Sequence, residues 1–309
     1  MTDAKPEGGW TFTLLPGVFL AGAVSLAILG ALIPSVRGDD SAATTSTALA
    51  DSTPRAPVMA RDVRVQAILE GYASLMDSVI YLDDDAVFYL PQGPVYFQGG
   101  RMLAPADLPR AHEFDPIIYD YPLRPLTVPL PMADEPRYSR DFLEKAFGTT
   151  EEEIRSHGVS AEFLGRKVFV NEFCLDSLKA VEGEILEAAA TNPHVSAWVQ
   201  DIKVAYSFID KEIAGTRGRS HHAWGLAIDL VPNSYRGKQV YWRWSRVFNR
   251  EDWDRIPMEE RWSPPQAVIQ AFENHGFVWG GKWSRFDTIH FEFRPEIVAY
   301  NQMMAEILP

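Results

Sequence analysis

The chain has one cysteine in 309 residues and no run of basic residues. A single thiol excludes an internal disulfide framework and any metal site built from Cys-x-x-Cys pairs. The formal net charge of −13 argues against nucleic acid as a partner, because phosphate binding requires clustered Lys and Arg. Hydrophobic residues make up 46% of the chain, which is enough for a sizeable core. A metal site in this chain would therefore need histidine and carboxylate ligands.

Ionisable side chains are also missing near the N-terminus, from Gly8 to Val36. Residues 12–33 are nearly all apolar, which matches the ~20 residues needed to span a bilayer. The basic start and nearby cleavage site of a secretory signal peptide are not evident, so we expect an uncleaved transmembrane anchor. A cleaved signal peptide and a buried helix of a soluble protein are the alternatives. The flanking charges are too balanced to fix the orientation.

The composition predicts five successive segments. Residues 1–11 form a short tail before the anchor at 12–33. Residues 34–60, rich in Ser, Thr, Ala and Asp, are expected to be a flexible linker. Residues 61–160 form an accessory region to which we can assign no chemistry, and residues 161–309 form a C-terminal domain.

Apolar periodicity predicts a mixture of helices and short strands. In the accessory region we expect a helix within 63–82 and a hairpin of 87–89 with 95–97. Further on we expect strands at 168–170, 202–206, 227–231 and 291–293, a helix carrying Cys174 as a buried thiol, and a helix capped by Ser263 and ended by Gly276. Together these elements predict an α+β fold, with a small mixed or antiparallel sheet and flanking helices.

Two polar segments could carry chemistry: residues 220–229 and residues 279–292. Catalytic zinc takes three protein ligands from histidines and carboxylates and leaves a fourth position for water. His222, Asp229 and His290 supply such a set. Asp287, three residues before His290, is a candidate to take the proton of the attacking water. Spacing alone leaves a structural role for each histidine open.

The wider pattern is more specific. Residues 220–229 match the pattern Ser-x-His-x-x-Gly-x-Ala-x-Asp, and Asp287 precedes His290 as the acidic residue of a second pattern. These segments resemble the zinc metallopeptidase family of D-alanyl-D-alanine carboxypeptidases and L-alanyl-D-glutamate endopeptidases, over roughly residues 165–297. The run from Gly276 to Trp283 and the aspartate at position 287 are similar to the endopeptidase branch.

The resemblance implies a DD-peptidase or hedgehog-like zinc peptidase fold with Zn²⁺ as the cofactor. His222, Asp229 and His290 would be the metal ligands, and Asp287 the general base and acid. Ser220 would hold the ligand loop by a hydrogen bond, and Glu292 could orient His290 or meet a substrate amine.

The sequence departs from the family at one place. Many members carry an arginine just after the strand before the first pattern, where it steadies the carbonyl oxygen of the substrate. This chain has Ala205-Tyr206-Ser207-Phe208 there. Arg217, or alternatively Arg219, is the candidate to supply the missing positive charge.

The expected activity is hydrolysis of peptide bonds in peptidoglycan stem peptides, either as an endopeptidase or as a carboxypeptidase. A single-pass protein of the cell membrane with its catalytic domain outside the cytoplasm would meet this substrate. One alternative is a non-catalytic, zinc-containing protein that binds or scaffolds the cell wall. Another is a peptidase for small peptides unrelated to the wall. Aromatic residues between the two patterns could line a substrate groove or simply pack as core and lid: Tyr241, Trp242, Trp244, Trp253 and Trp262.

Overall fold

The computed structural model describes residues 62–132, 136–209, 218–248 and 251–307. The predicted tail, the anchor at 12–33 and the linker at 34–60 lie outside this part of the chain. Among the described residues, no helix has both the length and the apolar character needed to cross a bilayer. The described residues all belong to one compact unit.

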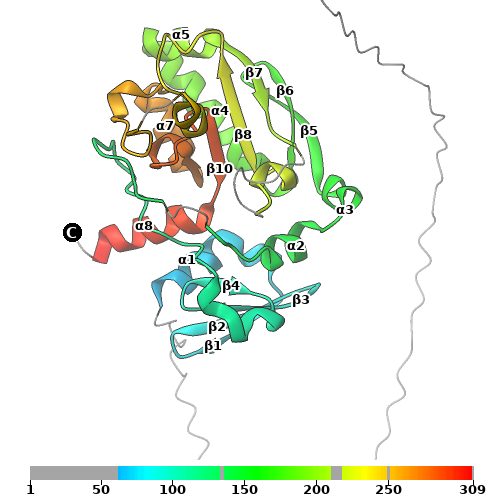
Figure 1. Cartoon of the computed structure of the whole chain (residues 1–309). Helices are drawn as coiled ribbons and strands as arrows, with labels where there is room; N and C mark the ends of the chain where they lie inside the picture. Colours follow the sequence, from blue (N-terminus) through cyan, green and yellow to red (C-terminus); the bar gives the residue numbers. More distant parts are fainter. Residues whose placement is uncertain (1–61, 133–135, 210–217, 249–250, 308–309) are drawn as a thin grey trace, which may run out of the picture. The chain divides into compact units, whose positions relative to one another are not determined.

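The sheet at the centre of the C-terminal half is antiparallel (Figure 1). Its strand order is β7-β8-β10-β9. The strands are β7 (Ile202–Tyr206), β8 (Ala227–Pro232), β10 (His290–Phe293) and β9 (Phe277–Trp279). The expected strands at 202–206, 227–231 and 291–293 are all present, and the α+β class with antiparallel sheets and flanking helices is confirmed.

One face of this sheet is covered by helices and is apolar. α4 (Glu172–Thr191) is the predicted helix with buried Cys174, and α5 (Pro193–Asp201) and α7 (Gln266–Asn274) complete the layer. Phe291 of β10 stacks on Phe272 of α7 with ring centroids 3.8 Å apart. Because successive side chains of a strand point to opposite faces, the residues that alternate with these apolar ones must face away from the helices.

The hairpin of β5 (Gly158–Phe163) and β6 (Arg166–Asn171) leads into α4. It follows the short helix α3 (Glu151–Ser156), whose N-terminus is closed by a capping box between Thr150 and Glu153. Between the two sequence patterns, the short helix α6 (Trp242–Val247) precedes α7 and buries Trp242 and Ser245.

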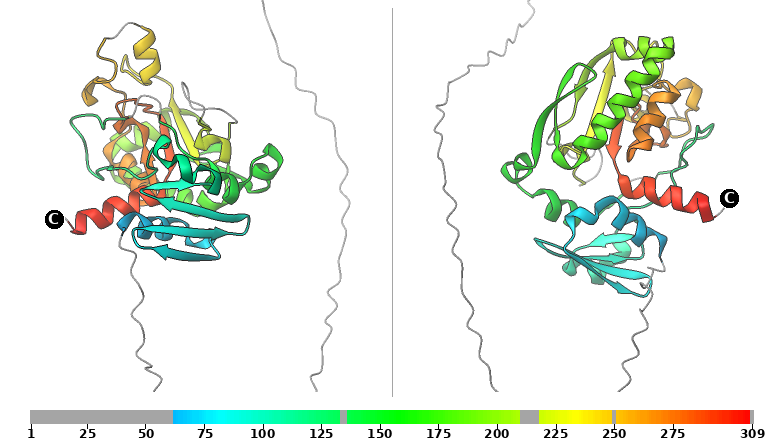
Figure 2. Two further views of the ribbon diagram at one scale, coloured as in Figure 1. Left: turned by 60° about the horizontal axis from the view of Figure 1, so that its bottom comes forward. Right: turned by 180° about the vertical axis from the view of Figure 1, so that it is seen from behind.

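The N-terminal described region is a second antiparallel sheet of order β1-β2-β3-β4 (Figure 2). Its strands are β1 (Ser78–Leu82), β2 (Asp85–Leu90), β3 (Gly93–Gln98) and β4 (Arg101–Leu103). The predicted hairpin at 87–97 is thus present as β2 and β3.

The helix predicted within 63–82 is only half correct. α1 covers Val63–Tyr72, and the chain then turns and continues as β1. Residues 78–82 pair with β2 along their full length, and this pairing satisfies the backbone groups that a helix would otherwise have bonded internally. The apolar pattern of residues 78–82 was compatible with a helix or a strand, and pairing with β2 selected the strand.

α8 (Pro295–Ile307) joins the two halves, and it lies beside α1 (Figures 1 and 2). Ala299 of α8 is buried in the core of the N-terminal sheet, whereas Ile297 and Val298 pack against β9 and Tyr121. α2 (Asp141–Phe147) contributes Phe142 to the same N-terminal core. The N-terminal region is therefore packed directly onto the element that follows β10.

The start of α7 differs from the expectation. Ser263 does not cap the helix, because its hydroxyl donates to the carbonyl of Pro264, and Pro265 is the N-cap residue of a helix that begins at Gln266. Two prolines in succession keep residues 264 and 265 extended. The other end is as predicted, with Gly276 at a φ of +84°.

Gly225 makes the turn that leads into β8. Its φ is +68°, and a Cβ at this position would lie 2.8 Å from the backbone nitrogen of Asn171. Both the left-handed conformation and the close approach of β6 therefore require glycine.

We expect Gly225→Ala to lower the free energy of unfolding by about 2–4 kcal/mol, because it combines a strained φ with a backbone clash. Urea unfolding followed by circular dichroism would measure the change. Gly183→Ala is the matched control: Gly183 lies inside α4, and a Cβ there meets nothing within 4 Å. This control should be stabilised by about 0.5–1 kcal/mol, since alanine restricts the unfolded chain. Equal stability of Gly225→Ala and the parent would show that the turn is not a constraint.

Candidate metal centre

The pairing of β8 with β10 builds the centre of the site. Their antiparallel register places His290 directly opposite Asp229. Directly opposed residues of an antiparallel pair point to the same face of the sheet. This face is the one turned away from α4 and α7, so the two polar side chains meet outside the apolar core.

His222 approaches the same point from the turn before β8. It lies on the short 3-10 segment η3 (His221–Trp224), where Ser220 is the N-cap residue. The Ser220 hydroxyl accepts a hydrogen bond from the His222 backbone nitrogen at 3.4 Å, in agreement with the role that the family resemblance implied. Gly225 then reverses the chain into β8, which brings His222 back over Asp229.

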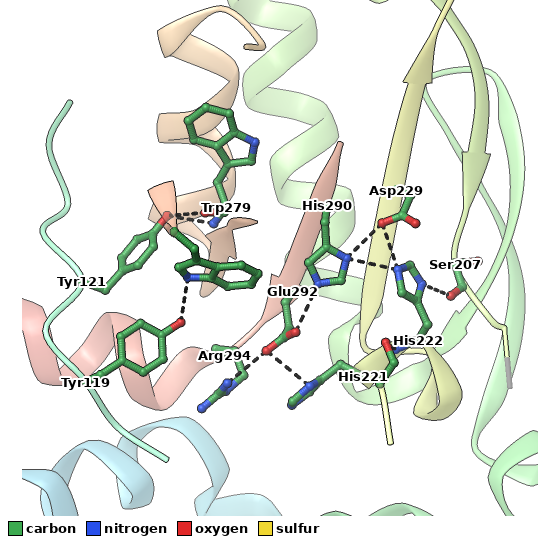
Figure 3. Close-up of polar contacts among 12 residues, drawn as sticks. Tyr119, Tyr121, Ser207, His221, His222, Asp229, Trp279, His290, Glu292 and Arg294 are labelled. Carbon is green, nitrogen blue, oxygen red and sulfur yellow. Dashed lines mark hydrogen bonds and ion pairs between the residues drawn. The ribbon is translucent and has the colours of Figure 1, made fainter. Parts of the chain in front are cut away.

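The three side chains converge closely (Figure 3). Asp229 Oδ1 lies 2.9 Å from both His222 Nε2 and His290 Nδ1, and the two nitrogens are 3.1 Å apart. All three side chains are buried. The residues that the sequence singled out as a candidate ligand set are therefore within reach of one ion.

The outer ring nitrogens determine how the hydrogens are arranged. His222 Nδ1 lies 2.5 Å from the Ser207 carbonyl oxygen, and His290 Nε2 lies 3.1 Å from Glu292 Oε2. A carbonyl and a carboxylate can only accept, so each of these nitrogens carries a hydrogen and donates it. In the neutral imidazoles, the inner nitrogens then present lone pairs towards each other and towards the Asp229 carboxylate.

This donor set fits a divalent cation. Three lone pairs facing one another repel unless a positive charge lies between them. Zinc bonds of about 2.0–2.1 Å place neighbouring ligand atoms of a tetrahedron about 3.3 Å apart, close to the observed separations. Two imidazoles and one carboxylate, each fixed by an outer hydrogen bond or strand pairing, are a zinc-type set with a fourth position left for a water.

The protonation equilibria point the same way. Burial by itself would raise the pKa of Asp229, but hydrogen bonds with His222 and His290 hold that pKa far below its ordinary value. Burial would lower the pKa of His290, but its bonds to Asp229 and Glu292 raise it to about 10. The cluster therefore favours one positive charge at its centre, and a bound cation would displace the proton, because metal ligands must be deprotonated.

A row of charged residues continues from the cluster along β10. Glu292 bonds His290 through one oxygen, and its other oxygen lies 3.0 Å from Arg294 NH1 and 3.3 Å from His221 Nδ1 (Figure 3). Arg294 Nε donates to Glu296 Oε1 at 2.5 Å, and Tyr72 donates to the other Glu296 oxygen at 2.8 Å. His290, one of the three candidate ligands, is thus tied through buried charges to helix α1.

Sequence reasoning left Arg294 and Glu296 without a role, although a signal was present. His290, Glu292 and Arg294 occupy alternate positions, with Phe291 and Phe293 between them. A period of two places these three on one face of an extended segment, and Glu296 follows in the first turn of α8. Burial by itself would raise the pKa of Glu292. The neighbouring His221, His290 and Arg294 lower this pKa, so that Glu292 stays an anion. Burial lowers the pKa of His221 to about 4, so its imidazole is neutral.

Asp287 lies beside the cluster in a cavity of about 290 Å3, whose wall it shares with His290 and Glu292. The backbone nitrogen of Asp287 donates to the Gly280 carbonyl. The backbone carbonyl of Asp287 accepts a hydrogen bond from the backbone nitrogen of His290 at 3.2 Å. A Cβ on Gly280 would lie 2.7 Å from the Asp287 carbonyl oxygen, which explains the glycine in the Trp-Gly-Gly segment. Burial and the charges of both Asp287 and Asp229 raise the pKa of Tyr241, as expected if the two carboxylates share one neighbourhood.

The described residues do not include Arg217, the arginine expected to stabilise the carbonyl oxygen of the substrate. Its catalytic role therefore stays a prediction. Arg219, the alternative, lines the cavity, donates to the Thr149 carbonyl at 2.9 Å and lies over the Trp224 ring. At the place where relatives carry their arginine, Ser207 instead accepts the hydrogen bond of His222 through its carbonyl.

The aromatic insertion divides between the two expected roles. Tyr241 and Trp242 line the cavity, whereas Trp262 is buried in the main core and Trp244 is 51% exposed. The insertion therefore supplies both core and cavity wall.

Comparison with protein families identifies part of this region. Residues 214–293 match the family model described as D-alanyl-D-alanine carboxypeptidase. The family resemblance is confirmed over this segment, which contains the three clustered residues, Asp287 and Glu292. No solved structure matches the chain. The N-terminal sheet and the helices α1 to α5 lie outside the matched segment.

We expect Glu292→Gln to weaken zinc binding by about tenfold, because the anion that fixes the His290 ring becomes a neutral amide. Competition with a chromophoric chelator would measure the affinity. Glu184→Gln is the matched control, since Glu184 bonds His275 Nε2 at 3.1 Å far from the cluster in sequence and on the surface. Equal zinc affinity of both variants would show that Glu292 does not support the ligand.

Proposed function

We propose that this protein is a zinc-dependent peptidase that hydrolyses peptide bonds in peptidoglycan stem peptides. The observation that supports it most strongly is the convergence of His222, Asp229 and His290 with their inner lone pairs facing one point. The family match over residues 214–293 supports peptide hydrolysis as the reaction. A peptidase also accounts for the open cavity beside the cluster.

Each residue has a defined task in this proposal. His222, Asp229 and His290 would hold Zn²⁺, whose chemistry is to lower the pKa of water towards about 7 and to polarise the scissile carbonyl. The Asp287 carboxylate takes the proton of the attacking water and returns it to the leaving amine. Ser207 and Glu292 keep the two imidazoles in the tautomers that present lone pairs inward.

The proposal extends to which peptide bond is cut and to where in the cell the protein lies. The segment from Gly276 to Trp283 and the aspartate at position 287 favour an endopeptidase, whereas the matched family model is described as a carboxypeptidase. Residues 12–33 would anchor the chain in the cell membrane with its catalytic part outside the cytoplasm, where peptidoglycan lies. Mass spectrometry of digested peptidoglycan would identify the bond.

A zinc-containing protein that binds the wall without cutting it is the second candidate. It is favoured by the absence of an arginine at residues 205–208, where relatives carry one. Digestion of purified peptidoglycan with and without a chelator separates the two functions. New free amino groups that appear only without the chelator exclude pure binding, and a protein that cuts free dipeptides but not sacculi would be a peptidase unrelated to the wall.

We expect His222→Ala to lose zinc, because two ligands are left in place of three. Asp287→Ala should keep zinc and lower kcat by about 10²–10⁴-fold, since proton transfer loses its acceptor. Metal content measured by elemental analysis and cleavage of stem peptides would be compared for the two variants. Asp176→Ala, which changes a fully exposed carboxylate on α4, is the control and should match the parent. Cleavage by Asp287→Ala at the parental rate would refute the assigned base.

A further inference from the structure

The cavity beside the metal cluster has two walls of different origin. One comes from the segment that matches the family and includes Asp287, His290 and Glu292. The other comes from the N-terminal region and from the chain that leads out of it, and it includes Tyr119, Tyr138 and Arg140. The family match therefore says nothing about half of the surface that a substrate would touch.

Hydrogen bonds hold the N-terminal wall in place. Trp283, whose ring centroid lies 5.9 Å from that of His290, donates through its indole nitrogen to the Tyr119 hydroxyl at 3.1 Å. Arg294 donates to the Ile117 carbonyl, and Tyr72 donates to Glu296. The wall is thus bonded to the row of charges that begins at the ligand His290.

Tyr138 is one of the polar residues that line this cavity. It is half-buried, and among the described residues no hydrogen-bond partner of its hydroxyl is found. Burial raises its pKa, and the charges of Asp115 and Glu292 raise it further against the opposing effect of Arg294. The hydroxyl therefore keeps its hydrogen and can donate it to a ligand.

Both arginines and carboxylates line the cavity. Four arginines line it, namely Arg140, Arg219, Arg285 and Arg294, against the three carboxylates of Asp287, Glu292 and Glu296. Glu292 and Glu296 are both paired with Arg294. A divalent cation bound by the neighbouring cluster would add positive charge beside the cavity and favour an anionic group there.

Arg140 is the arginine of the N-terminal wall. Its guanidinium lies 3.3 Å from Glu144, four residues on, and its side chain is 50% exposed. Exposed ion pairs of this kind contribute little free energy, so a ligand carboxylate can take the place of Glu144 at small cost. Tyr138 and Arg140 are two residues apart, and both side chains reach the cavity.

We propose that Tyr138 and Arg140 form a subsite that binds a carboxylate of the peptide substrate, at a position away from the bond that is cut. This inference rests on the proposed peptidase function, and it makes the N-terminal region a determinant of specificity. The recognised group is a carboxylate, which a stem peptide carries both at the free carboxyl of its D-glutamate and at its C-terminus.

The test measures binding separately from hydrolysis. A synthetic stem peptide of L-alanine, D-glutamate, L-lysine and D-alanine is titrated calorimetrically into the metal-free full-length chain. Two further peptides carry a carboxamide in place of the D-glutamate carboxyl or of the C-terminal carboxyl. We expect the parent to bind one of the amidated peptides about tenfold more weakly than the acid, the range of a charge-assisted hydrogen bond.

Arg140→Gln should bind the acid about tenfold more weakly and should lose the discrimination against that amide. Tyr138→Phe should show a smaller loss in the same direction. Arg137→Gln is the matched control, because Arg137 is exposed, pairs with Glu113 and does not line the cavity. With zinc added, Arg140→Gln should raise KM for the acid and leave kcat within about twofold.

Equal binding of all three peptides by the parent, or parental affinity in Arg140→Gln, would overturn the subsite. Discrimination between acid and amide without any cleavage in the presence of zinc would keep the subsite and refute the peptidase function instead. An equal loss of affinity in Arg137→Gln would show that the effect is general electrostatics and would also overturn the proposal.

Discussion

The antiparallel register of β8 and β10 is the constraint on which the rest of the site depends. It sets Asp229 opposite His290, with Ile228 and Phe291 buried among the helices on the other face. A shift of one residue would place the carboxylate in the apolar core and a phenylalanine at the cluster. The burial of the apolar residues thus fixes the position of the polar ones, and the core and the candidate metal centre are specified by the same pairing.

The cluster also explains why so many charges are buried around it. Two imidazoles can present lone pairs inward only if acceptors hold their outer hydrogens, and the Ser207 carbonyl and the Glu292 carboxylate do so. A buried carboxylate needs further partners, which for Glu292 are Arg294 and His221. Arg294 in turn is paired with Glu296, which accepts from Tyr72. The need to satisfy each buried group extends the network to helix α1.

This network gives the N-terminal region a structural connection to the chemistry. Its small sheet shares a core with α8, and Tyr119 and Tyr138 reach the same cavity as Asp287. The segment that matches the carboxypeptidase family model supplies the cluster and the proposed base. Tyr138 and Arg140, which we propose determine specificity, precede this segment in the sequence.

The sequence by itself determined the residues of the candidate site and most of the strands and helices near it. Local signals suffice for this: the spacing from Ser220 to Asp229, the alternation along β10 and the glycine at position 276 act within a few residues. Segments whose local pattern was ambiguous depended on their partners, as when residues 78–82 paired with β2 instead of extending a helix. Only the tertiary structure decided that Arg294 and Glu296 carry the support of His290 across to Tyr72, and that Tyr138 and Arg140 face the cavity. The bonds from Glu296 to Tyr72 and from Arg294 to Ile117 span 224 and 177 positions of the chain. Their geometry follows from packing of the whole core, which no local pattern encodes.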